Sequence, residues 1–146
     1  MRTPTCLTAA TVAAVMKRDD VRGLWPQELG AELAGRFGEA FARCLQAGGC
    51  IAPRVVIGHD ARLGSYDLAG AFARGVAAAG GHPVPLGLVS TEHVYYMTGR
   101  YAQSFAGGAM ITASHNPPTY NGIKFVFSGA RPLAGALEVL PALRVA

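Results

Sequence analysis

The sequence predicts an α/β protein: a three-layer α/β/α sandwich around a mixed, mostly parallel sheet of four to five strands. Two observations support this prediction. Apolar residues recur every four positions in stretches of helical length, and short apolar runs typical of buried strands lie between them. The order strand–helix–strand–helix–strand is typical of layered α/β folds, in which the ligand-binding loops follow the strands along one rim of the sheet. A length of 146 residues fits a single domain.

The first half of the chain supplies two helices and two strands. Residues 29–45 carry leucine or phenylalanine at every fourth position, which predicts a helix with one buried stripe. Residues 54–58 predict a short, fully buried strand. A helix is expected over residues 65–79, with Ser65 as its N-cap. Residues 82–88 predict a strand whose two prolines place it at or near an edge.

The second half supplies one helix and two strands. A helix is expected to begin at Ser90 and to extend towards residue 101, followed by a strand over residues 107–112. Residues 123–127 predict a further strand, in which alternation places Lys124 on the face opposite its aromatic residues.

The two ends of the chain are expected to lie outside this pattern. Residues 1–16 are expected to form an N-terminal extension, as a surface helix or a loose tail. The tail from Ala134 is compatible with a short helix, which Pro141 would limit.

The charge distribution points to an anionic ligand. The net charge of +4 is modest and no cluster of basic residues is present, so a nucleic-acid partner is not expected. Between residues 93 and 136 there is no acid, while Arg100, Lys124 and Arg131 are present. Such a stretch favours a ligand such as phosphate, with chance in a charge-poor chain as the alternative.

The remaining composition favours a cytoplasmic protein. The three cysteines are odd in number and fit no zinc or disulfide pattern. No apolar run reaches the roughly 18–20 residues of a membrane span, so no membrane partner is expected. The stretch before residue 17 is rich in alanine and threonine rather than leucine, which argues against a signal peptide.

A polar loop after the third predicted strand contains the chemistry. It has the sequence T-A-S-H-N-P-P-T-Y-N-G-I-K over residues 112–124. A serine such as Ser114 needs a base or strong electrostatic help, but no G-x-S-x-G motif surrounds it, which argues against a serine hydrolase. A hydroxyl near His115, Lys124 and an arginine from elsewhere suits phosphate, while an ordinary polar turn is the alternative.

Three motifs resemble those of one family. Residues 112–124 are similar to the active-site serine loop of the α-D-phosphohexomutases, in particular the phosphomannomutase/phosphoglucomutase branch. Residues 20–23, D-V-R-G, are similar to its D-[IV]-R-G motif, and residues 56–62, V-I-G-H-D-A-R, resemble its G-x-D-x-R element. On this resemblance residues 17–146 correspond to the amino-terminal domain, domain I, and the later domains are expected to be absent.

The resemblance implies an intramolecular phosphotransferase of carbohydrate metabolism that interconverts hexose 1-phosphate and hexose 6-phosphate. Ser114 would carry a phosphoryl group, give it to the hexose phosphate to form a bisphosphorylated sugar, and take back the other phosphate. His115 and Lys124 would assist proton transfer and neutralise charge, and Arg22 would contact the phosphoserine.

The resemblance also implies a binding set and cofactors. Asn116, Asp19 and Arg62 are the expected substrate- or phosphate-binding residues. For Arg62, holding the serine loop or simply pairing with Asp60 are the alternatives. Mg²⁺ would bind an oxygen of the phosphate on Ser114 together with three carboxylates of the next domain. A sugar 1,6-bisphosphate would serve as activator.

The chain also departs from the family pattern. Members are several times longer, and here only one acid, Glu138, follows Glu92, so no aspartate-rich magnesium loop is present. The isolated chain is therefore expected to be inactive without the remaining domains, and to be able to dimerise through apolar surface. Asp19 stands where many relatives have an aromatic residue, and an acid there would repel phosphate or face away. The alternative function is a non-catalytic phosphate-binding or interaction module derived from such an enzyme.

Overall fold

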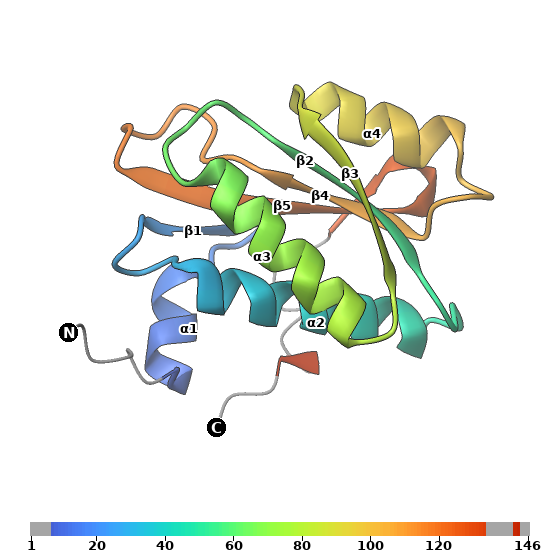
Figure 1. Ribbon diagram of the computed structural model, residues 1–146, viewed down its shortest axis with the longest axis horizontal. Coiled ribbons are helices and arrows are strands. Elements are labelled where there is room, and N and C mark those ends of the chain that lie inside the picture. The colour runs from blue at the N-terminus through green and yellow to red at the C-terminus, as the bar shows by residue number, and fades with distance from the viewer. Residues whose placement is uncertain (1–6, 134–141, 144–146) are drawn as a thin grey trace.

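A central sheet with helices on both faces forms the structure (Figure 1), a computed structural model that describes residues 7–133 and 142–143. Helices α2 (Ala31–Ala47) and α3 (Ser65–Ala78) cover one face, and α4 (Thr91–Arg100) covers the other. Helix α1 (Ala9–Val15) packs beside the first strand, on the side of α2 and α3. These layers confirm the predicted α/β/α sandwich.

The sheet is mixed, as predicted, with the strand order β1-β5-β4-β2-β3 and with β6 paired to β5. Strand β2 is parallel to β3 and to β4, whereas β5 is antiparallel to β1, β4 and β6. The parallel part is therefore three strands wide, smaller than in the mostly parallel sheet predicted. The strands are β1 (Val21–Leu24), β2 (Arg54–His59), β3 (His82–Leu88), β4 (Gly107–Ile111), β5 (Tyr120–Phe127) and β6 (Arg131–Pro132).

The two strands that the sequence does not predict are the two shortest. Strand β1 has four residues and β6 has two, which is too short for a recognisable alternation of apolar and polar side chains. Both pair with β5 and extend the antiparallel part of the sheet that β4 and β5 begin. Strand β3 pairs only with β2 among the described strands, in agreement with its predicted place at the edge.

The predicted helices are present, and they differ from the prediction at the start of α2 and in the cap of α3. Helix α2 begins two residues after Leu29, whose side chain is nevertheless fully buried in the core. Helix α3 is capped by Gly64 and not by Ser65. Gly64 has a positive φ of 82°, and the ring of Trp25 occupies the place that a Cβ would take. The expected short helix from Ala134 falls mostly on residues outside those described.

The stretch predicted as an extension contributes to the core. Val12 and Val15 of α1 are buried against the same apolar cluster as α2 and α3. Thr8 caps this helix, because its hydroxyl accepts a hydrogen bond from the backbone of Thr11 at 3.2 Å. Among the described residues, no helix is both long enough and apolar enough to cross a membrane.

Alternation along β5 divides the two cores as predicted. Ile123, Phe125 and Phe127 lie in the cluster beneath α2 and α3, and Val126 lies in the smaller cluster beneath α4. Lys124 is therefore on the α4 face of the sheet. The pairing of β5 with β1 and β4 therefore decides on which face of the sheet Asn121 and Lys124 lie.

Candidate functional site

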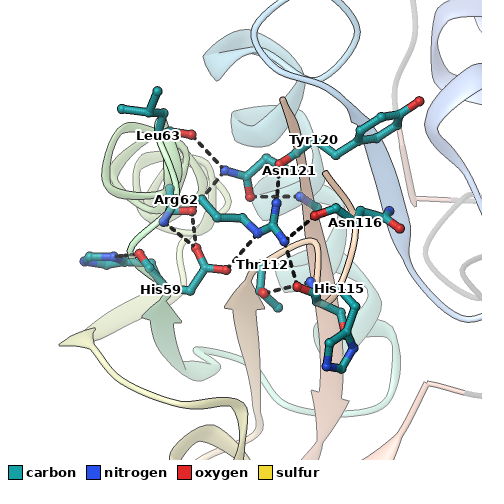
Figure 2. A network of polar contacts seen from close by, with 12 residues as sticks. His59, Arg62, Leu63, Thr112, His115, Asn116, Tyr120 and Asn121 are labelled. Atoms are coloured by element: carbon teal, nitrogen blue, oxygen red, sulfur yellow. Dashed lines mark hydrogen bonds and ion pairs between the residues drawn. The ribbon is translucent and has the colours of Figure 1, made fainter. Parts of the chain in front are cut away.

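The candidate site lies where β2 and β4 end and β5 begins. We call residues 112–120, from the end of β4 to the first residue of β5, the serine loop. The backbone N–H of Asp60, just after β2, donates to the carbonyl of Ile111 at 3.1 Å. The backbone N–H of Thr112 donates to the carbonyl of Gly122 at 3.0 Å. Figure 2 shows the side chain of Arg62 reaching from the β2 side into this loop.

Ser114 is exposed at the tip of this loop and has an uncommon backbone conformation. Its φ is 56°, in the left-handed region that side chains other than glycine rarely adopt. Its N–H donates to the hydroxyl of Thr112 at 3.0 Å, and the N–H of Asn116 donates to the carbonyl of Ala113 at 3.1 Å. The loop thus presents the Ser114 hydroxyl to solvent on a backbone fixed by local hydrogen bonds.

The side chain of His115 contacts the Ser114 hydroxyl. Its Nδ1 lies 3.2 Å from the Ser114 Oγ, and the ring is exposed. A ring nitrogen at this distance can exchange a proton with the hydroxyl, which is the role of a general acid or base.

Arg62 holds the inner side of the loop. Its Nη2 donates to the carbonyl oxygens of Ser114 and Asn116, both at 2.7 Å, and its Nη1 donates to those of Pro117 at 2.9 Å and Tyr120 at 3.2 Å. All four N–H bonds of the two terminal nitrogens are therefore used on backbone carbonyls. In this structure Arg62 binds the protein's own backbone. Its expected role in binding phosphate stays a prediction.

Asp60 orients this arginine. One oxygen lies 3.3 Å from the Arg62 Nε, and the other accepts from the backbone N–H of Arg62 at 3.0 Å and from the Ser65 hydroxyl at 2.6 Å. The Asn121 amide then donates to Ser65 at 2.9 Å and to the carbonyl of Leu63 at 3.2 Å. Ser65 and Asn121 are fully buried, so this chain of contacts ties α3 to β5.

Two predicted cations share the α4 face of the sheet next to the loop. Arg22 is the register partner of Gly122, and Lys124 is the next residue of β5 on that face. Arg22 is held by Asp20, whose carboxylate lies 2.8 Å from its Nη2. Among the described residues, no ion pair involves Lys124. Lys124 therefore leaves a positive charge for an anion at this edge, whereas the charge of Arg22 is already paired with Asp20.

The other two predicted binding residues are placed differently. Asn116 is half-buried in the serine loop and contributes its backbone carbonyl to Arg62. Asp19 is exposed and pairs with its neighbour Arg18 at 3.2 Å. No described contact joins Asp19 to the serine loop.

Three residues of the site received no functional role from the sequence: Thr112, Ser65 and Asn121. Ser65 resembles a helix cap, and Asn121 lies in a Y-N-G turn, so neither spacing points to a shared hydrogen bond. One feature of the sequence could have identified these residues. All three lie close to the ends of predicted strands, and in α/β folds such strand ends meet at the same edge of the sheet.

The family of the chain follows from a comparison with sequence families. The model described as "Phosphoglucomutase/phosphomannomutase, alpha/beta/alpha domain I" matches residues 13–138. The chain belongs to the phosphoglucomutase/phosphomannomutase family. The match covers the serine loop and both other motifs, so the resemblance predicted from the sequence is confirmed.

Individual members of the phosphoglucomutase/phosphomannomutase family are similar over most of this chain. A protein named "Phosphohexose mutases" from Xanthomonas campestris pv. campestris is 45% identical over 118 residues, which are 81% of this chain and 25% of that protein. A "Phosphomannomutase" from Klebsiella pneumoniae is 38% identical over 125 residues, 86% of this chain and 75% of that protein. A "Phosphoglucosamine mutase" from Clostridium tetani is 40% identical over 120 residues, 82% of this chain and 26% of that protein.

Solved structures of the family have the same fold. A phosphoglucomutase/phosphomannomutase family protein from Burkholderia thailandensis superposes with a TM-score of 0.77 and is 31% identical, and a "putative phosphomannomutase" from Thermus thermophilus gives 0.78 and 30%. In both cases 89% of this chain and 30% of the other chain are covered. The chain spans about a quarter of the length of most of the curated relatives named above.

The magnesium expected from the family needs more ligands than the described residues bring together. Among them, no group of three or more histidine, cysteine, aspartate or glutamate side chains is placed to hold a metal ion. A phosphate on Ser114 would add oxygen ligands of the kind Mg²⁺ prefers, but the residues described here do not complete a magnesium site.

Proposed function

We propose that this chain is the phosphoserine-bearing domain of a hexose phosphomutase, with Ser114 as the residue that carries the phosphoryl group. The observation that supports this most directly is the exposed Ser114 hydroxyl, 3.2 Å from the His115 Nδ1. Arg22 and Lys124 lie on the α4 face of the strands that adjoin the serine loop. Family membership supplies the substrate class, because the similar proteins carry the names of hexose phosphate mutases.

The proposed reaction transfers one phosphoryl group twice. First, a hydroxyl of the hexose phosphate attacks the phosphorus on Ser114: a sugar O–P bond forms, the Ser114 Oγ–P bond breaks, and the proton of the sugar hydroxyl ends on the Ser114 Oγ. The product is a sugar 1,6-bisphosphate. After the sugar turns round, Ser114 attacks the other phosphate, and the proton returns to the sugar oxygen. His115 moves the proton at the Ser114 Oγ in both directions.

Arg22 and Lys124 neutralise charge in this proposal. A phosphoserine carries a charge between about −1.5 and −2 near neutral pH, in the usual range for a phosphate monoester, and the incoming sugar phosphate adds a similar charge. Phosphoryl transfer is catalysed mainly by positioning and by cations close to the phosphoryl oxygens. Arg22 is held in place by Asp20, and Lys124 projects from strand β5.

The proposal includes parts outside this chain. Mg²⁺ would bind the phosphate of Ser114 together with carboxylates of a further domain, and a sugar 1,6-bisphosphate would load the serine. Leu63 and Tyr66 are 75% and 76% exposed at the rim next to the site, where the remaining domains, or a second copy of the chain, would cover them. The chain alone is expected to be catalytically incomplete. A cytoplasmic location, expected from the cysteine usage, is also part of the proposal.

The test uses the chain fused to the remaining three quarters of the Xanthomonas campestris relative. Glucose 1,6-bisphosphate or mannose 1,6-bisphosphate is added, and intact mass spectrometry measures the gain of one phosphoryl group. The Ser114→Ala variant is expected to lose this gain, whereas the control Ser104→Ala, at an exposed serine before β4, is expected to keep it. Interconversion of the hexose phosphates is then assayed with the fusion and with the chain alone.

Each outcome decides between the proposals. Phosphorylation at Ser114 with turnover by the fusion, but not by the chain alone, supports a phosphomutase domain that needs its neighbours. Turnover by the chain alone contradicts catalytic incompleteness. Absence of phosphate on Ser114 in a folded fusion contradicts the phosphoserine role and favours a non-catalytic phosphate-binding module.

A further inference from the structure

We propose that Arg62 is a positioning residue, which holds the serine loop and the left-handed backbone of Ser114 in place, and that it is not a ligand of the substrate phosphate. This inference rests on the proposed function for its catalytic part only. The structural part concerns contacts within the chain itself, so it can be tested with no substrate present.

The donors of Arg62 are already used. Its two terminal nitrogens carry four N–H bonds, and each of these points to a different carbonyl of the serine loop, at 2.7 to 3.2 Å. The remaining donor, Nε, faces the Asp60 carboxylate at 3.3 Å. A guanidinium has five N–H bonds in a fixed plane, so a phosphate could be bound only by giving up one of these partners.

The contacts of Arg62 bear on the conformation of Ser114. A residue other than glycine in the left-handed region persists only where its surroundings fix it. Here the Ser114 carbonyl is bound at 2.7 Å by a charged donor, and the Ser114 N–H is bound by Thr112 at 3.0 Å. Both sides of the residue are therefore held, and its side chain is left to solvent beside His115.

The position of Arg62 is itself fixed from behind. Asp60 accepts hydrogen bonds from the Ser65 hydroxyl and from the Arg62 backbone, and Ser65 accepts from the buried amide of Asn121. Only 16% of the Arg62 side chain is exposed. A lysine could occupy this place with its single ammonium, but three donors on one nitrogen cannot reach four carbonyls spread over seven residues.

The first test measures hydrogen exchange in the chain without any ligand. Arg62→Lys is compared with the wild type and with Arg74→Lys, a control at an exposed arginine of α3. The amides of Ser114, Asn116 and Tyr120, which are hydrogen-bonded in the loop, are expected to exchange at least about 10-fold faster in Arg62→Lys only. Amides of β2 are expected to be unchanged. Equal exchange of the loop in all three proteins overturns the inference.

The second test measures the rate at which the fused protein takes a phosphoryl group from a hexose 1,6-bisphosphate onto Ser114. Displacement of a reacting group by about 1 Å can reduce a rate roughly 100-fold, so Arg62→Lys is expected to lower the maximal phosphorylation rate constant by about that factor, with the half-saturating bisphosphate concentration changed less than about 3-fold. A raised half-saturating concentration with the maximal rate constant unchanged overturns the inference, because that is the effect of losing a phosphate ligand. Arg62→Ala, if it folds, is expected to regain rate with added guanidinium and not with ammonium.

The two tests separate this inference from the proposed function. If the wild-type fusion takes no phosphoryl group, the phosphoserine proposal fails, and the exchange experiment still decides whether Arg62 holds the loop. If the wild type is phosphorylated and Arg62→Lys matches it in rate and in exchange, the inference fails while the proposed function stands.

Discussion

Helices α2 and α3 contact each other through glycines, and this contact allows a quantitative prediction for Gly75→Ala. An added Cβ at Gly75 would overlap the backbone oxygen of Gly35 and would lie 2.8 Å from its carbonyl carbon and 2.9 Å from the backbone nitrogen of Glu39. These are backbone atoms of the neighbouring helix and cannot rotate away. The two helices would therefore have to separate, which would loosen the core between them.

The expected net effect combines two opposing contributions. Replacing a helical glycine with alanine favours the helix by about 1 kcal/mol. Overpacking usually costs about 1–3 kcal/mol, and the upper end applies here because the obstructing atoms belong to the backbone. The Gly75→Ala variant is thus expected to lose about 2 kcal/mol of unfolding free energy, equivalent to roughly 6 °C in Tm at about 3 °C per kcal/mol.

Gly70→Ala on the same helix is the matched control. The nearest atom to an added Cβ there is the Nη1 of Arg74 at 3.5 Å, the end of a flexible side chain. This variant is expected to gain up to about 1 kcal/mol, because only the helix propensity changes. Urea unfolding of both variants measures the difference. If Gly75→Ala is as stable as Gly70→Ala, the inference that the two helix backbones are in direct contact is refuted.

Three further substitutions test the site and the core. Gly122→Ala is expected to destabilise by about 2 kcal/mol in urea unfolding, because its Cβ would lie 2.5 Å from the carbonyl oxygen of Val21 in β1 and 2.7 Å from that of Thr112 at the start of the serine loop. Asn121→Asp removes the buried donor to Ser65 and is expected to cost about 3 kcal/mol at pH 7, with part of the loss recovered as the pH falls and the carboxyl group is protonated. Phe41→Ala, at a fully buried ring among three other phenylalanines, is expected to cost about 3–5 kcal/mol and is checked by the same measurement.

The regular elements were predictable because their patterns are local. The four-residue spacing of α2 and the apolar runs of β2 and β4 each extend over enough residues to identify the element. The faces of β5 were predictable for the same reason, since alternation is a property of the strand alone. Strand β1 was missed because four residues contain too little pattern, and its place in the sheet is set by pairing with β5, about a hundred residues later in the chain.

The site was predictable in its residues but not in its contacts. Ser114, His115 and Arg62 were identified from motifs, and the motifs carry no information on which atoms meet. The contacts of Arg62 with the serine loop join residues more than fifty positions apart and depend on the loop backbone turning its carbonyls inwards. The positive φ of Ser114 is likewise a consequence of its surroundings, because serine by itself disfavours the left-handed region.

The register of β5 connects the fold to the site. Asn121 points to the side of α3, where it binds Ser65, whereas Lys124 points to the side of α4. A slip of one residue would exchange the two faces and remove both contributions at once. The position of Gly122 opposes such a slip. Its carbonyl accepts a hydrogen bond from the Thr112 N–H, and its own N–H donates to the Asn121 side chain. A side chain at this point would meet the backbone of β1 at Val21 and that of the serine loop at Thr112. The glycine between them therefore helps to fix the side of the sheet on which the Asn121 amide lies and the side on which Lys124 lies.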